Sequence, residues 1–279
     1  MNKTRWRFPV VLNCRRSGLW AGVLGVLLLW AAPAWPAPPD FLEALEKAER
    51  RRVSHVIDGD TLVLQDGREV RLVGLQAPKL PLGRKGFREW PFAREARETL
   101  EMLTRGAFVT LYYGGRKVDR YGRILAHLVR DDGLWVQGDM LSRGMARVYS
   151  FPDNRALVAE MLTRERAARA ARRGIWRLTY YAVKDHLEAG RFLNSFQIVE
   201  GRVREVARRR SITYLNFGAD WRQDFTVVIR GRARRLFEKT GLDLDNLKNK
   251  KIRIRGWLKY YNGPMIEATH PEQIEILSR

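Results

Sequence analysis

Two Asp-Gly dipeptides, at positions 58–59 and 66–67, punctuate a run of alternating apolar residues. Residues 53–57 lead into the first dipeptide, and residues 70–74 follow the second. An Asp-Gly pair between two such runs is typical of a tight hairpin turn, because the turn needs a positive φ that glycine adopts readily. This spacing predicts antiparallel strands within a strand-rich block from about Arg51 to Arg130.

The chain then continues with both helical and extended patterns. Gly174 is the expected C-cap of the last helix, since glycine adopts the left-handed conformation that ends many helices. Strands wrapped as a small barrel with helices packed outside correspond to the OB-fold class. The expected elements are a helix at 93–103, strands at 108–113 and 124–129, and helices at 136–143 and 157–173.

A second run of strand-like segments begins at Phe196. Three strands, a helix and two more strands follow one another, which is an OB-fold order. The fold class expected for the chain is therefore mainly β with helices (α+β), with two small OB-fold-like barrels, the first carrying packed C-terminal helices. The second barrel is expected to use strands at 199–203, 212–217, 225–229, 252–258 and 273–277, with a helix at 233–240.

A length of 279 residues leaves room for two small domains rather than one. Asp40 is expected to cap a short helix ahead of the first barrel. Tyr180 and Tyr181 are expected to pack between the domains. The predicted organisation is an export signal at 1–34, a short helical segment at 35–50, a first domain at 51–176, a connector at 177–195 and an OB-fold-like domain at 196–279.

The first 34 residues have the pattern of an export signal. A basic start precedes an apolar stretch at 18–32, and Ala32-Pro33-Ala34 offers a cleavage site. An uncleaved anchor is the alternative. The protein is thus expected to be periplasmic or secreted. The single cysteine, Cys14, lies inside this segment, so a mature chain would use neither disulfides nor thiolate metal ligands.

Basic residues outnumber acidic ones, with 52 Lys and Arg against 31 Asp and Glu. The formal net charge is +21, and removal of the five basic residues of the export segment lowers it to +16. A surplus of this size favours a polyanionic partner, either nucleic acid or an anionic surface. His127 lies in an alternating strand without metal-ligand spacing, so we expect it to be a packed or surface histidine rather than a metal ligand.

Three motifs in order give the chain its resemblance to a known family. With Arg71 on the strand between the outer two, they resemble the staphylococcal nuclease (thermonuclease-like) family over about Arg51 to Trp176. The C-terminal barrel is similar to one seen in some bacterial thermonuclease-like proteins. The motifs are Ile57-Asp58-Gly59-Asp60-Thr61, Arg71-Leu72-Val73-Gly74-Leu75-Gln76-Ala77-Pro78-Lys79 and Asp119-Arg120-Tyr121-Gly122-Arg123.

The resemblance implies phosphodiester hydrolysis with Ca²⁺, a carboxylate base and two arginines. By position, Asp60 corresponds to a calcium carboxylate and the Ala77 backbone carbonyl to another ligand. Arg71 and Arg123 correspond to the two arginines that bind the phosphate. Tyr121 corresponds to a tyrosine that faces the nucleotide.

Two positions depart from the family pattern. Gln76 stands where an aspartate calcium ligand is expected, and Lys79 stands where the glutamate base is expected. An amide brings no charge to calcium, and an ammonium group repels a cation nearby. The favoured interpretation is an exported protein that binds DNA or RNA, in single-stranded form, with hydrolysis weakened or lost.

The sequence leaves two alternatives open. The first is an active nuclease, in which Glu69 or Glu89 enters the site or Lys79 binds phosphate directly without a metal. The second is a non-enzymatic scaffold of the cell envelope that binds protein, polymer or anionic lipid. Steep weakening of single-strand binding by salt would favour the nucleic-acid interpretation.

The second barrel contains aromatic residues among arginines, the combination that binds single strands on OB-folds. Phe225 and Trp257 are expected in its core. The candidates for contact with nucleic acid are Arg208, Arg209 and Arg210 in a loop, with Tyr214, Trp221 and Tyr261 as exposed aromatic residues.

Overall fold

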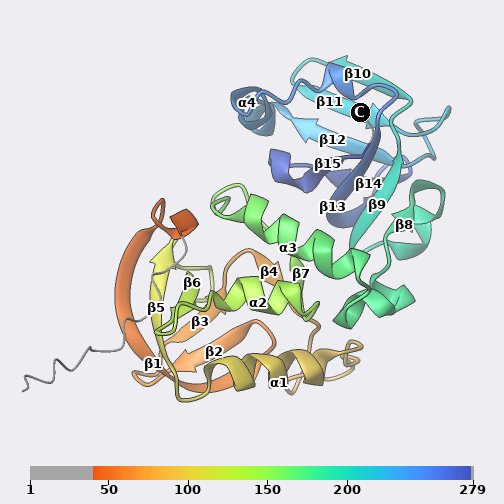
Figure 1. The fold of residues 1–279 in the computed structure, drawn as a ribbon. Helices are drawn as coiled ribbons and strands as arrows, with labels where there is room; N and C mark the ends of the chain where they lie inside the picture. Colours follow the sequence, from red (N-terminus) through yellow and green to blue (C-terminus); the bar gives the residue numbers. More distant parts are fainter. Residues whose placement is uncertain (1–39, 278–279) are drawn as a thin grey trace, which may run out of the picture. The chain divides into compact units, whose positions relative to one another are not determined.

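The computed structural model describes residues 40–277 (Figure 1). The expected export signal at 1–34 lies outside the described residues, as does the start of the expected helical segment at 35–50. Within residues 40–277 no helix is both long enough and apolar enough to cross a membrane.

The first domain contains a closed five-stranded barrel with the strand order β1-β2-β3-β6-β5, which confirms the expected OB-fold-like barrel. β3 and β6 run parallel, and the register places Arg71 of β3 between Thr61 and Leu125 of the neighbouring strands. The strands are β1 (Glu46–Asp58), β2 (Thr61–Leu64), β3 (Glu69–Leu72), β5 (Phe108–Tyr113) and β6 (Ile124–Arg130), with a separate pair β4 (Leu75–Gln76) and β7 (Arg147–Val148).

Three helices pack outside this barrel, as the periodicity predicted. They are α1 (Ala93–Thr104), α2 (Val136–Ser142) and α3 (Val158–Ala170). Their apolar sides, including Leu100 and Met140, share one buried cluster with strand residues such as Leu62 and Leu111. The last helix ends at Ala170, earlier than expected. Gly174 has a φ of +51° and begins a short 3-10 helix instead of capping α3.

The expected helical segment at 35–50 is wrong for the part that the structure describes. Only Asp40–Leu42 forms a 3-10 turn, η1, and β1 already begins at Glu46. Glu46 pairs with Tyr113 and Arg50 with Thr110 of β5. The polar residues at the start of β1 are held in extended form by this backbone pairing, which overrides their local preference.

The connector is built from short elements rather than a loose linker. Tyr181 is buried and its hydroxyl donates to the Pro91 carbonyl over 2.7 Å, whereas Tyr180 remains largely exposed. Tyr181 shares a buried cluster with Trp176 and with Ile198 of the next domain, so it does pack between the domains. The elements are η2 (Gly174–Arg177), η3 (Thr179–Tyr181), β8 (Lys184–Asp185) and η4 (His186–Phe192).

The second domain repeats the strand order of the first. Its sheet runs β10-β11-β12-β14-β13-β9-β8, β12 and β14 are parallel, and β9 leads after two residues into β10, the strand at one end of the order. Phe225 is buried in its core, as expected. The elements are β9 (Phe196–Arg202), β10 (Glu205–Arg209), β11 (Ile212–Asn216), β12 (Thr226–Arg230), α4 (Gly231–Lys239), η5 (Asp245–Leu247), β13 (Lys251–Tyr260), β14 (Pro264–Glu267), η6 (Pro271–Gln273) and β15 (Ile274–Ile276).

Three expectations for this domain are corrected. Strands β10 and β14 were not expected, because the first has no apolar alternation and the second begins with proline. Arg208 and Arg209 consequently lie on β10, and only Arg210 occupies the turn, with a φ of +49°. Trp257 is 42% exposed rather than in the core, because Leu258 takes the inward position on β13.

A buried ion cluster joins the two domains. Glu165 on α3 bonds the Arg255 guanidinium through two contacts of 2.9 Å, and Arg255 also bonds Glu275 over 2.6 Å. Burial alone would raise the pKa of Glu165, but the charge and hydrogen bonds of Arg255, the charge of Arg169 and the Val148 N–H together outweigh burial and lower it. β13 is thereby fixed against α3 (Figure 1).

Candidate functional site

The turn between β1 and β2 buries two carboxylates at one end of the first barrel. Asp58 ends β1 and Asp60 directly precedes β2, and both side chains are buried. The Asp60 backbone N–H donates to Asp58 Oδ1 over 3.0 Å, and the Thr61 hydroxyl donates to Asp60 Oδ1 over 3.2 Å. These contacts fix the direction in which the Asp60 carboxylate points.

Gly59 is required in this turn by lack of space. A Cβ there would lie 2.6 Å from the Ala77 Cβ and 2.8 Å from the Ala96 Cβ. The positive φ expected for Asp-Gly turns occurs at Gly67, where φ is +84°, whereas Gly59 is not among the glycines of positive φ. The first turn therefore needs glycine because helix α1 and the loop after β4 approach it closely.

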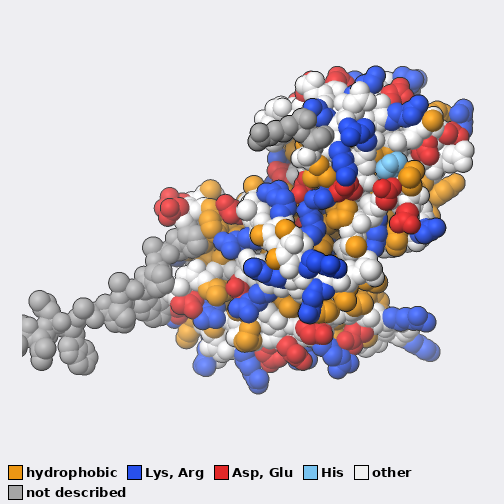
Figure 2. Space-filling model, turned by 45° about the vertical axis from the view of Figure 1, so that its right-hand side comes forward, with side chains coloured by type: hydrophobic (Ala, Val, Ile, Leu, Met, Phe, Trp, Pro, Cys, Tyr) orange, Lys and Arg blue, Asp and Glu red, His pale blue; other side chains and the backbone are white. Residues whose placement is uncertain are grey.

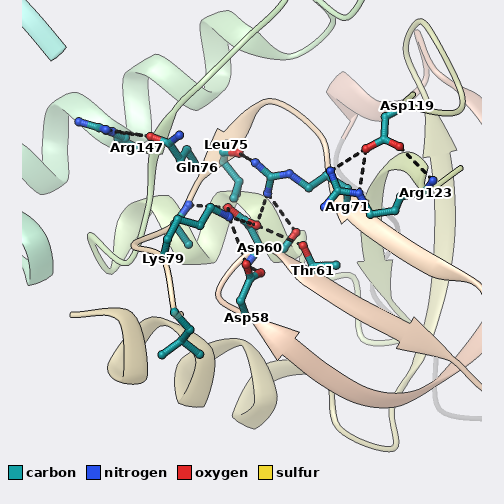
Figure 3. A network of polar contacts seen from close by, with 12 residues as sticks. Asp58, Asp60, Thr61, Arg71, Leu75, Gln76, Lys79, Asp119, Arg123 and Arg147 are labelled. Atoms are coloured by element: carbon teal, nitrogen blue, oxygen red, sulfur yellow. Dashed lines mark hydrogen bonds and ion pairs between the residues drawn. The ribbon is translucent and has the colours of Figure 1, made fainter. Parts of the chain in front are cut away.

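The Lys79 ammonium group lies between the two carboxylates (Figure 3). Its Nζ is 2.6 and 2.7 Å from the two Asp60 oxygens and 3.2 Å from Asp58 Oδ2. The Arg71 guanidinium contacts Asp60 Oδ1 as well. Asp60 thus has two cationic partners in a buried position, which is the arrangement that a buried carboxylate needs.

The pKa values of the two acids shift in opposite directions. Burial alone would raise the pKa of Asp60, but the charges of Arg71 and Lys79 outweigh it and hold that pKa below its ordinary 3.8. Burial, reinforced by the charge of Asp60, raises the pKa of Asp58. Asp60 is therefore the carboxylate that stays ionised most firmly.

Gln76 is held away from Asp60 by an arginine. β4 and β7 pair Gln76 with Arg147, and the Gln76 Oε1 accepts from Arg147 Nε over 3.1 Å and from Nη2 over 2.8 Å. Arg147 is buried over the Phe196 ring at 4.6 Å, and burial lowers its pKa to about 10. The amide oxygen expected at the metal position is consequently used inside the protein.

The two expected phosphate-binding arginines are both positioned by neighbouring groups. Arg71 donates to the Asp60 carbonyl over 3.2 Å and to the Leu75 carbonyl over 3.0 Å. Arg123 donates from Nε to Asp119 Oδ2 over 2.8 Å. Both side chains remain partly accessible, so these contacts orient the guanidiniums without removing them from solvent.

A cavity of about 610 Å³ opens over these residues. Arg71, Lys79 and Arg123 line it, and Tyr121, which is 67% exposed, stands at its edge. The Arg120 guanidinium lies over the Tyr121 ring at 4.7 Å. The cavity therefore combines cationic groups with an exposed aromatic ring.

Sequence reasoning missed several residues that line the same cavity. Arg120 lies within the Asp119–Arg123 motif and Arg116 lies three residues before it, so their place in the sequence offered a signal. Nothing in the local sequence marks the other three, because the loop after β4 and the chain after β7 bring them there. The missed residues are Arg84, Arg116, Arg120, Tyr149 and Phe151.

The expected second-domain candidates do not line this cavity. Arg208 is paired with Asp245 over 2.6 Å. Trp221 and Tyr261 are exposed, at 48% and 70%, and Tyr214 of β11 is half-buried. Lys and Arg side chains are spread over both domains on the face in Figure 2, with acidic ones between them, so charge alone does not identify a second site.

Comparison with known proteins places the first domain in a family. The profile described as "Staphylococcal nuclease homologue" matches residues 69–178. An uncharacterized endonuclease of Escherichia coli is 35% identical over 128 residues, covering 45% of this chain and 75% of that protein. A probable staphylococcal-like nuclease of Oryza sativa subsp. japonica, CAN1, is 32% identical over 114 residues, 41% of this chain and 30% of its own length. Endonuclease YhcR of Bacillus subtilis is 27% identical over 151 residues, 50% of this chain and 12% of its own length.

Proposed function

This chain belongs to the family of staphylococcal nuclease homologues, and we propose that it binds single-stranded nucleic acid in the cavity of its first domain, with calcium-dependent hydrolysis lost. The observation that carries the proposal is the position of Lys79 Nζ, within 2.7 Å of both Asp60 oxygens. The family relation supports nucleic acid as the ligand, and this contact supports the loss of metal-dependent chemistry.

The residues around Asp60 do not fit a calcium ion. Calcium takes six to eight oxygen ligands, several of them carboxylate oxygens. Asp60 Oδ2 already accepts from Lys79 and from the Ala77 N–H over 2.8 Å. Within residues 40–277 no group of three or more His, Cys, Asp or Glu side chains has a geometry that could hold a metal ion. We therefore assign no step of a reaction to calcium here.

The Gln76 side chain is not free to bind a metal. Its amide oxygen receives two hydrogen bonds from Arg147, so a metal would have to displace a buried guanidinium to reach it. A hydrogen bond to a charged group contributes roughly 1.5 to 3 kcal/mol, so the loss of these acceptor contacts would be costly for a buried arginine. Position 76 therefore stabilises the joint of β4 and β7 instead of serving as a ligand.

The alternative general bases are also distant from this chemistry. Glu89 is paired with Arg94 over 2.9 Å, and Glu69 is exposed on β3. Neither residue lines the cavity. A water molecule in the cavity would thus lack a carboxylate base at the place where the family has one.

Binding can proceed without that chemistry. Arg71 and Arg123 present guanidiniums suited to the oxygens of a phosphate, which they can contact in pairs. The exposed Tyr121 ring offers a surface on which a base can stack. Stacking requires an unpaired base, so the cavity favours a single strand over a duplex.

The test measures binding and hydrolysis of a fluorescein-labelled single-stranded DNA by the same preparation. We expect binding that weakens steeply with salt, and no cleavage with either calcium or EDTA. Cleavage that EDTA abolishes would contradict the loss of metal chemistry. Absence of binding at low salt would contradict the nucleic-acid function and favour an envelope scaffold.

A set of restored variants makes this test sharper. Gln76→Asp with Lys79→Glu returns the two family acids, but Arg147 would pair with the new aspartate. We therefore expect the triple variant, which adds Arg147→Met, to gain more calcium-dependent cleavage than the double variant. Arg147→Met alone is the matched control and should not cleave.

We propose in addition that residues 1–34 direct export and are removed. The support is the basic start followed by an apolar stretch and an Ala-x-Ala site. The intact mass of the protein recovered from the periplasm or medium tests this. Recovery of the full-length chain in the membrane fraction would favour the uncleaved anchor.

A further inference from the structure

An aromatic path leads out of the cavity toward the second domain. Phe151, 49% exposed, and Tyr149 both line the cavity, and their rings meet edge to face with centroids 4.9 Å apart. The Tyr149 N–H donates to the Gly74 carbonyl over 2.8 Å, which fixes this segment to the loop that forms the cavity wall.

Trp257 continues this path on the second domain. Its indole Nε1 donates to the Tyr149 hydroxyl over 2.9 Å, and 42% of the residue remains exposed. A tryptophan whose N–H is bonded and whose ring is accessible is suited to contact with a ligand. Trp257 is therefore one residue removed from the cavity wall.

The position of Trp257 relative to the cavity is fixed by the buried ion cluster. Residues of one strand alternate between its two faces, so Arg255, Trp257 and Lys259 share a face of β13. Arg255 on that face is bound to Glu165 of α3. The side chain of Ser150, next to Tyr149, bonds His270 over 2.7 Å. These two contacts, Arg255 with Glu165 and Ser150 with His270, hold the Tyr149 segment and β13 next to each other.

We propose that Trp257 is a stacking platform for the nucleotide that follows those bound in the cavity. The inference rests on the proposed function, because it needs a strand in the cavity. The second domain would then add a base-binding site that continues the cavity of the first domain.

The occupant that fits this path is a single-stranded nucleic acid. Six cationic side chains line the cavity against three aspartates, so a polyanion is favoured there. Aromatic rings beyond the cavity suit unstacked bases, whose faces bind rings irrespective of sequence. Lys259, exposed two residues after Trp257 on the same face, supplies a cation for the adjoining phosphate.

The experiment compares two oligonucleotides by fluorescence anisotropy in EDTA. A fluorescein-labelled thymidine trinucleotide reaches the cavity alone, and a thymidine dodecamer extends beyond it. We expect Trp257→Ala to weaken dodecamer binding about tenfold and to leave the trinucleotide unchanged, since loss of one stacked base has an effect of this size. Trp257→Phe keeps a ring and should retain most of the affinity.

Trp221→Ala is the matched control, because Trp221 is similarly exposed on the same domain but its ring lies against Arg222 instead of next to the cavity residue Tyr149. A loss of dodecamer affinity with Trp221→Ala but not with Trp257→Ala would overturn the inference and assign the strand to another surface. Equal dodecamer affinity for wild type and Trp257→Ala would overturn it while leaving the proposed function intact. Failure of both oligonucleotides to bind wild type would overturn the proposed function and the inference together.

A second measurement uses the wild-type chain, so it does not depend on folding of a variant. A dodecamer carrying photoreactive 5-iodouracil is crosslinked, and the modified peptide is identified by mass spectrometry. We expect a crosslink in the β13 peptide that contains Trp257. Crosslinks confined to the first domain or to other strands of the second domain would overturn the inference.

Discussion

The two barrels have the same strand order but carry side chains of opposite charge at one turn, between β1 and β2 in the first and between β10 and β11 in the second. In each, two neighbouring strands run parallel, β3 with β6 and β12 with β14. The β1–β2 turn of the first barrel contains Asp58-Gly59-Asp60, and the β10–β11 turn of the second contains Arg209-Arg210-Ser211. The acids are buried, whereas the arginines are exposed.

The connections that follow β3 and β12 explain this difference in charge. In the first barrel residues 73–92 separate β3 from α1, and this loop supplies Gln76, Ala77 and Lys79. In the second barrel β12 ends at Arg230 and α4 begins at Gly231. A buried carboxylate needs partners, and only the first barrel has a loop long enough to return them. Both barrels thus have an equivalent turn, but only the segment at 73–92 of the first barrel supplies partners that allow charge to be buried in that turn.

Reversal of the Lys79 charge should have the largest effect. Lys79→Glu would place a third carboxylate beside Asp58 and Asp60 and remove a cation from them. We expect a loss of about 4 kcal/mol of unfolding free energy in EDTA. Urea denaturation measures it, with and without calcium, and calcium should return part of the loss. Lys85→Glu, exposed on the same loop, is the control, and an equal effect of both variants would contradict the prediction.

The buried charges that stabilise the second barrel lie in the cluster around Arg255, where it contacts α3, and not in the β10–β11 turn. Arg255→Met would remove the most buried cation of the cluster and leave Glu165 and Glu275 with the more exposed Arg166 and Arg169. We expect a loss of about 3 kcal/mol in unfolding free energy, since removal of one partner leaves buried charge incompletely compensated. Arg191→Met, which breaks an exposed pair with Glu188, should change it by no more than about 0.5 kcal/mol. Similar losses in the two variants would mean that the cluster does not hold the domains.

The acid stability of the first barrel should depend on a buried histidine. Burial lowers the pKa of His127 from 6.5 to about 3. The unfolded chain therefore binds a proton between these pH values that the folded chain does not, so stability falls as pH drops below 6.5. His127→Leu should flatten this decline by roughly 3 kcal/mol at pH 4. Denaturation series across pH measure the slope, and an unchanged slope in the variant would refute the assignment.

The smallest effect is expected for Tyr121→Ala, which tests whether the first barrel binds the base nearest to Arg120 and Arg123. Tyr121→Ala removes the exposed ring beside Arg120 and Arg123. We expect single-strand affinity to fall about fivefold, at the lower end for one stacked base. Tyr260→Ala, equally exposed on the second barrel, is the control. A larger loss from the control would reverse the comparison and place the first base on the second barrel.

Most of the first domain could be predicted from its sequence because its signals are local. Asp-Gly turns and alternating residues mark the end of β1 and the strands β2 and β3, and helical periodicity marks α1, α2 and the start of α3. Strand β10 gave no such signal, since its residues are polar and its pairing with β11 uses the backbone. Hydrophobicity alone predicts a core position for Trp257, whereas the alternation along β13 places Leu258 inside and Trp257 outside.

The sequence by itself determined most helices and strands of the first domain, the family motifs and the two positions where acids are missing. It could not determine what replaces those acids, because that depends on contacts through space. Lys79 reaches Asp60 across 19 positions of the chain, and Arg147 reaches Gln76 across 71. The joint between the domains has the same origin, since Arg255 is buried only because α3 covers its face of β13. Local patterns fix which way a side chain points, and the folding of loops and domains fixes what it meets.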